Sequence, residues 1–153
     1  MQSEVAGIRG ALAFLRADDS RVQPQLSRTS YLGFSFGGII TTNLANRYKQ
    51  LGMPKPRAIF VDDPHDGGLN GDGEPALDDS LAGIPSTTLF QCHSGADGVM
   101  AGKPDSTCNA LFPKLTSIPA RNKDLVLTTT DRHGDSPLSS AHGVCSGRDG
   151  EAD

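Results

Sequence analysis

Residues 31–40, YLGFSFGGII, join two apolar runs through a serine set among glycines. The run before the serine is short and apolar, as is typical of a buried strand, and apolar residues recur at helical spacing over residues 37–50. Gly33, Ser35 and Gly37 match the G-x-S-x-G pattern of a nucleophilic serine held on a sharp turn between a strand and a helix. The pattern therefore has two interpretations, a tight turn that only small residues fit, or a serine whose hydroxyl faces a substrate.

The alternation of strand and helix continues on both sides of this stretch. Apolar residues at helical spacing predict a helix over residues 4–16, and short apolar runs predict strands at RAIFVDD, STTLFQC and KDLVLTTT, with a short helix near TCNALFPKL. Apolar strands joined by helical crossovers indicate a parallel sheet covered by helices on both faces. The predicted fold class is α/β, with about four mostly parallel strands, in a domain over residues 1–145 followed by a flexible tail over residues 146–153.

A serine nucleophile needs a base, and the base needs a carboxylate that orients it. In chains with this motif the order along the sequence is serine, acid, histidine. Asp97 follows the third predicted strand and is the candidate acid, with Asp62 and Asp63, at the end of the second strand, as alternatives. His142 lies well past the last predicted strand, where a loop can reach back over the serine, and is the candidate base. His133, close to the end of that strand, is the alternative.

Other polar residues of the sequence receive simpler interpretations. The backbone N–H of Phe36, at the start of the predicted helix, is the expected oxyanion donor. We expect His65 and His93 to be loop or surface residues. The Asp-rich residues 62–80 depart from the EF-hand template, so they predict a solvated loop and no metal site.

Composition and cysteine spacing narrow the class of protein further. The net charge is -4 at pH 7, without a cluster of basic residues, which argues against a nucleic-acid partner. No apolar run is long enough to span a bilayer, and the first ten residues do not match a signal peptide, so the location is left open. Cys92, Cys108 and Cys145 lack zinc-ligand spacing; they predict either three thiols or one disulfide, for which Cys108–Cys145 is the favoured pair.

Four segments together resemble a known family: GFSFGG, AIFVDDPHDGG, IPSTTLFQCHSGADGV and DRHGDSPLSSAHG. They resemble the carboxyl-terminal half of an α/β-hydrolase, in the esterase and lipase branch that includes chlorophyllases and cutinase-like polyester hydrolases. The resemblance covers residues 4–145 and implies Ser35 as nucleophile, Asp97 as acid and His142 as base. It also implies a carboxylic ester of a small molecule or lipid as substrate, and no cofactor.

The family's sheet has more strands than the chain is expected to form. We therefore expect the amino-terminal half of the fold, and with it the loop that donates the second oxyanion N–H, to be missing. Two functions remain open: a serine esterase, or a catalytically silent hydrolase-like fragment or interaction module. A strand edge without its partner also predicts self-association.

Overall fold

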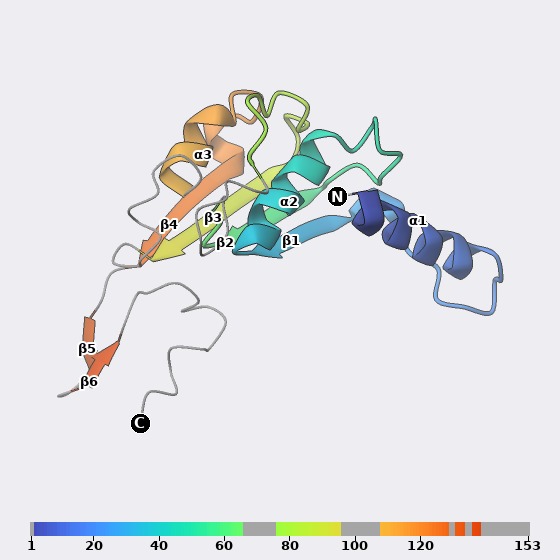
Figure 1. Ribbon diagram of the computed structural model, residues 1–153, viewed down its shortest axis with the longest axis horizontal. Coiled ribbons are helices and arrows are strands. Elements are labelled where there is room, and N and C mark those ends of the chain that lie inside the picture. Colours follow the sequence, from blue (N-terminus) through green and yellow to red (C-terminus); the bar gives the residue numbers. More distant parts are fainter. Residues whose placement is uncertain (1, 66–75, 96–107, 129–130, 134–135, 139–153) are drawn as a thin grey trace.

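The computed structural model describes residues 2–65, 76–95, 108–128, 131–133 and 136–138 of the 153-residue chain. Its centre is a four-stranded, all-parallel sheet in the order β1-β2-β3-β4 (Figure 1). The strands are β1 (Ser30–Phe34), β2 (Ala58–Asp62), β3 (Leu89–Gly95) and β4 (Lys123–Thr128). Because each strand pairs in parallel with the next one along the chain, the carboxyl ends of all four strands lie at the same end of the sheet. The predicted α/β fold class is confirmed.

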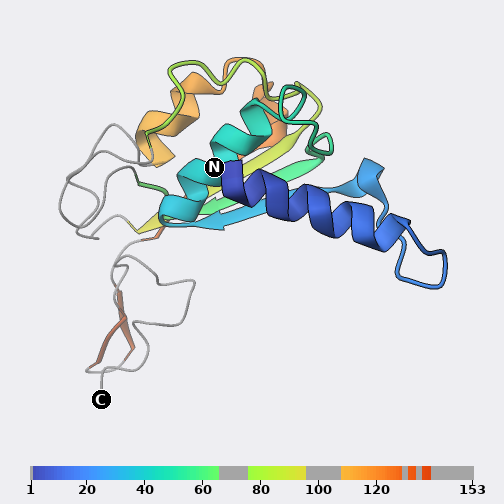
Figure 2. The same ribbon diagram turned by 45° about the vertical axis from the view of Figure 1, so that its right-hand side comes forward.

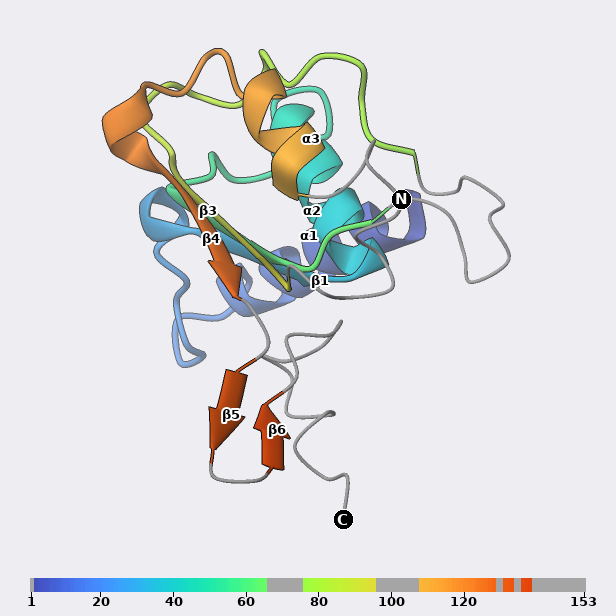
Figure 3. The ribbon, with the colours of Figure 1, turned by 90° about the vertical axis from the view of Figure 1, so that its left-hand side faces the viewer.

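In the described part of the chain three α-helices accompany the sheet, together with short 3₁₀ helices at Leu26–Arg28 and Ala120–Asn122. Helices α2 (Phe36–Asn46) and α3 (Cys108–Lys114) lie on the same face of the sheet (Figure 3). Helix α1 (Gln2–Arg16) runs beside the β1 edge (Figure 2). None of the described helices has the length and apolar composition needed to span a bilayer.

The apolar core lies between the sheet and the helices α2 and α3. Side chains alternate between the two faces of a strand, so on β1 Tyr31 is buried whereas Leu32 is 74% exposed. Deeply buried members of the core include Ile39, Ile59, Val61, Phe90, Leu111 and Leu115. Leu89, on the same face as Leu32, is 55% exposed. The expectation that helices cover both faces is therefore not met by the described residues.

A disulfide joins Cys92 on β3 to Cys108 at the start of α3, with 5.7 Å between the two Cα atoms. The predicted pairing of Cys108 with Cys145 is therefore wrong. The reason is that α3 lies against β3, so that residue 108 stands over the strand although 16 residues separate the two cysteines. Cys145 lies outside the described residues.

A second, two-stranded antiparallel sheet follows β4 and was not expected from the sequence. It consists of β5 (Asp131–His133) and β6 (Ser136–Leu138), in which His133 pairs with Ser136. The predicted tail over residues 146–153 lies outside the described residues.

Candidate active site

Ser35 forms the turn between β1 and α2. Its backbone has φ 58° and ψ −129°, in a region that side-chain-bearing residues rarely adopt. The turn is held by two backbone hydrogen bonds of 2.9 Å each: the Ser35 N–H donates to the carbonyl of Asp62, and the N–H of Gly38 donates to the carbonyl of Ser35. Such a conformation costs of order 1–3 kcal/mol and persists only where its surroundings impose it. The neighbouring strand β2 and the first turn of α2 together impose it on this serine.

Two glycines allow the backbone around Ser35 to pack this closely. A Cβ atom added at Gly33 would lie 2.1 Å from the backbone oxygen of Gly37. One added at Gly38 would lie 2.9 Å from the Cβ of Pro64, in the loop after β2. By contrast, a Cβ added at Gly37 would have no described atom within 4 Å other than its chain neighbours and the backbone of its own helix. Gly33 is therefore needed for the approach of β1 to α2, and Gly38 for the approach of the loop that follows β2.

That loop carries His65 to the serine. The Nε2 atom of His65 lies 2.8 Å from the Oγ atom of Ser35, within hydrogen-bond distance. The His65 side chain is 3% exposed, and its ring meets the ring of Phe36 edge-on, with 4.5 Å between the centroids. Asp63, with φ 40°, turns the chain after β2, and its N–H donates to the carbonyl of His93 at 2.8 Å. Strand pairing and ring packing thus place an imidazole against the Ser35 hydroxyl.

A second polar cluster lies at the carboxyl ends of β2, β3 and β4. The Oδ1 atom of Asp62 lies 2.6 Å from Nδ1 of His93, and Nε2 of His93 lies 3.3 Å from the hydroxyl oxygen of Thr128. Asp62 and His93 are directly opposite each other in the β2–β3 pairing, and both are buried. Asp62, an alternative candidate for the acid, therefore binds a different histidine from the one that contacts Ser35.

Of the residues predicted for the catalytic site, the structure describes Ser35 and Phe36. Phe36 is the first residue of α2, so its backbone N–H lies at a helix N-terminus beside the serine. Asp97 and His142 lie outside the described residues, as does the side chain of His133. Their roles stay predictions.

His65 lies in a loop, as expected, but the expectation that His93 is a loop or surface residue is wrong, because His93 lies on β3. Both side chains are buried, and both contact another polar side chain. Their positions depend on parallel pairing, which places the carboxyl end of β2 beside that of β1, with Asp62 opposite Phe34. One signal was present in the sequence: His65 follows the predicted strand RAIFVDD by two residues, at the carboxyl end of the sheet where Ser35 was expected.

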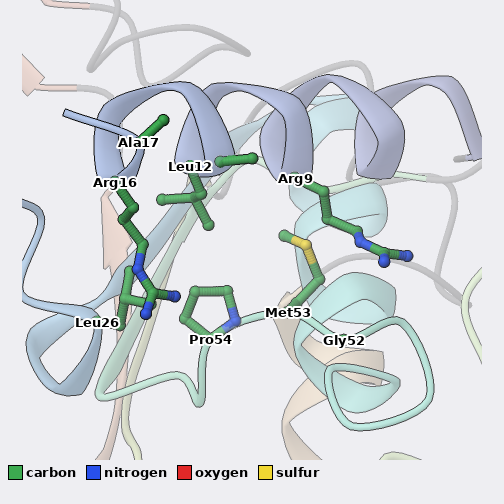
Figure 4. A pocket seen from close by; sticks show the side chains of 9 residues that line it. Arg9, Leu12, Arg16, Ala17, Leu26, Gly52, Met53 and Pro54 are labelled. Carbon is green, nitrogen blue, oxygen red and sulfur yellow. The ribbon is translucent and has the colours of Figure 1, made fainter.

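A hollow in the surface is lined by residues of α1 and of the segment that follows α2 (Figure 4). It is an open pocket of about 640 Å³ between α1 and the segment that follows α2. Its lining includes Leu12, Met53 and Pro54, with Arg9 and Arg16 at its sides. The pocket includes no residue of the Ser35 site, so it does not supply a binding pocket for a substrate of that serine.

Within the described residues, no group of three or more His, Cys, Asp and Glu side chains is placed to hold a metal ion. Comparisons with protein-family models, with curated proteins and with solved structures find no match to this chain.

Proposed function

We propose that this protein is a serine hydrolase that cleaves carboxylic esters through an acyl-enzyme intermediate on Ser35. The proposal is carried by one observation: Ser35 occupies a strained strand-to-helix turn, with its hydroxyl oxygen 2.8 Å from an imidazole nitrogen. A serine hydroxyl is a weak nucleophile unless a neighbouring base takes its proton. A base does so from about 2.6–3.2 Å, and the imidazole lies within that range.

The reaction follows from this arrangement. The Oγ atom of Ser35 attacks the ester carbonyl carbon while the hydroxyl proton passes to a histidine, and the negative charge that develops on the carbonyl oxygen faces the N-terminus of α2. There the N–H of Phe36 and the helix dipole stabilise it. The histidine returns the proton to the leaving alcohol, and water then releases the acid. The imidazole that contacts Ser35 belongs to His65, whereas the sequence pattern predicts His142 as the base and Asp97 as its orienting acid.

The resemblance to esterases and lipases of the α/β-hydrolase family supports a carboxylic ester as the substrate class, and it implies no cofactor. A catalytically silent interaction module is the second candidate function. The observation that favours it is the uncovered face of the sheet, where Leu32 and Leu89 are exposed. The two candidates differ in whether Ser35 is chemically activated.

Covalent labelling with a fluorophosphonate probe, located by peptide mass spectrometry, tests that difference without knowledge of the substrate. We expect the probe on Ser35, with hydrolysis of p-nitrophenyl butyrate that the Ser35→Ala variant lacks. Ser30→Ala is the matched control, because Ser30 is exposed at the other end of β1, and we expect it to behave as wild type. Folded wild-type protein that does not label at Ser35 would refute the hydrolase proposal and favour the silent module.

A further inference from the structure

We propose that His65 is the general base for Ser35, in the place that the sequence pattern assigns to His142. This inference rests on the proposed function and names the group that activates its nucleophile. His65 comes from the loop after β2, so the base would approach the serine from the neighbouring strand and not from the segment that follows β4.

The distance between the two side chains is the first argument. The Oγ–Nε2 separation of 2.8 Å lets the Ser35 hydroxyl donate directly to the ring nitrogen. The other buried imidazole of the described chain, that of His93, is engaged at both ring nitrogens, by Asp62 on Nδ1 and by Thr128 on Nε2. Of these two histidines, only His65 is placed to take the proton of Ser35.

His65 is also held in place before a substrate arrives. Burial to 3% exposure and the edge-on contact with Phe36 restrict the ring. The backbone that leads to it is restricted as well, because Pro64 has a limited φ and packs against Gly38 of α2. Helix α2 begins directly after Ser35. The same helix turn therefore orients both the nucleophile and the base, as efficient general-base catalysis requires.

The bond between Oγ and the acyl carbon forms as the Oγ–H bond breaks, the proton goes to Nε2 of His65, and the carbonyl π electrons move to the oxygen. When the tetrahedral intermediate collapses, the bond to the alcohol oxygen breaks, and the Nε2 proton passes to that oxygen. In deacylation His65 takes a proton from the attacking water and returns it to Oγ of Ser35.

The test compares two histidine variants by the rate of fluorophosphonate labelling at Ser35. Glutamine approximates the size of histidine and can hydrogen-bond to Oγ, but it cannot accept a proton. For His65→Gln we expect a loss of labelling rate of about 10²–10⁴-fold, the usual contribution of a general base, and for His142→Gln a change of less than about threefold. Circular dichroism and thermal unfolding show whether each variant keeps the wild-type fold.

A chemical rescue separates the base from a structural role. His65→Ala leaves a space beside Ser35, and free imidazole added to the buffer should restore part of the labelling in this variant, with no effect on wild type. Packing alone would not produce such a concentration-dependent rescue.

The outcomes separate the two proposals. Labelling of Ser35 in wild type that persists in His65→Gln, or that falls as far in His142→Gln as in His65→Gln, overturns the assignment of His65 and leaves the hydrolase proposal intact. A His65→Ala variant that imidazole fails to rescue also overturns the assignment. Wild-type protein without label on Ser35 refutes the hydrolase proposal itself.

Discussion

Replacement of Gly33 by alanine tests whether close packing builds the turn that carries Ser35. The added Cβ would lie 2.1 Å from the backbone oxygen of Gly37 and 2.5 Å from Oγ1 of Thr41, whereas Cβ atoms in real proteins essentially never approach within 3.0 Å. Strand β1 and helix α2 must therefore separate by close to an ångström. Because the nearest atoms are backbone, a side-chain rotation alone cannot relieve the overlap.

The cost follows from this geometry. Overpacking costs about 1–3 kcal/mol, and a contact with backbone belongs at the upper end, so we expect Gly33→Ala to lower the free energy of unfolding by about 3 kcal/mol. For a chain of this size that loss corresponds to a fall in Tm of about 6–12 °C. The same displacement would shift Ser35 relative to His65, so the labelling rate at Ser35 should fall as well.

Gly37→Ala is the matched control, because it changes the other glycine of the motif by the same methyl group. Its added Cβ would meet no described atom within 4 Å beyond its chain neighbours and the backbone of its own helix, and alanine restricts the unfolded chain more than glycine does. We expect stability to stay unchanged or to rise by up to about 1 kcal/mol. Urea unfolding followed by circular dichroism measures both variants. A Gly33→Ala protein as stable as wild type, or a Gly37→Ala protein destabilised as much as Gly33→Ala, would refute the packing argument.

Two further predictions concern the edge of the sheet and one buried tyrosine. Strand β1 is an edge strand, and its Leu32 is 74% exposed, so we expect concentration-dependent self-association that Leu32→Lys reduces, since a charged edge disfavours strand pairing. Light scattering after size-exclusion chromatography measures this, with Phe14→Lys on α1 as a control that should not change it; a wild type that is monomeric at every concentration would contradict the prediction. Burial, with a smaller contribution from Tyr48, raises the pKa of Tyr31 to about 12. Because the unfolded value is about 10, the stability that the neutral phenol contributes is complete below about pH 10 and is lost as the pH rises toward the folded value. Phenolate absorbance should therefore show a late phase that Tyr31→Phe lacks, and a tyrosine titration that is complete near pH 10 in the folded protein would count against it.

The sequence by itself determined the fold class and the positions of the main elements. Apolar spacing is local information, because a strand or helix reveals which residues face the core within a few residues of chain. The predicted run RAIFVDD contains β2, and KDLVLTTT contains β4. Ser35 also lies at the predicted turn between a strand and a helix. The sequence predicted less well which faces of the sheet the helices cover. The alternation of side chains between the two faces of β1 does not show whether a helix packs over Leu32.

The candidate site was only partly predictable for the same reason. Asp97 and His142 stay predictions, whereas the partner that the structure places at Ser35, His65, belongs to a loop without periodicity. Its position depends on the β1–β2 register, the turn at Asp63 and the approach of Pro64 to Gly38.

Tertiary structure also decided the pairing of Asp62 with His93 and the disulfide between Cys92 and Cys108. Each joins residues on different elements, 31 and 16 positions apart in the chain. Local patterns show which face of a strand a residue occupies. Which residue lies opposite it is determined by strand register and by helix packing over the sheet, and these depend on contacts distant in sequence.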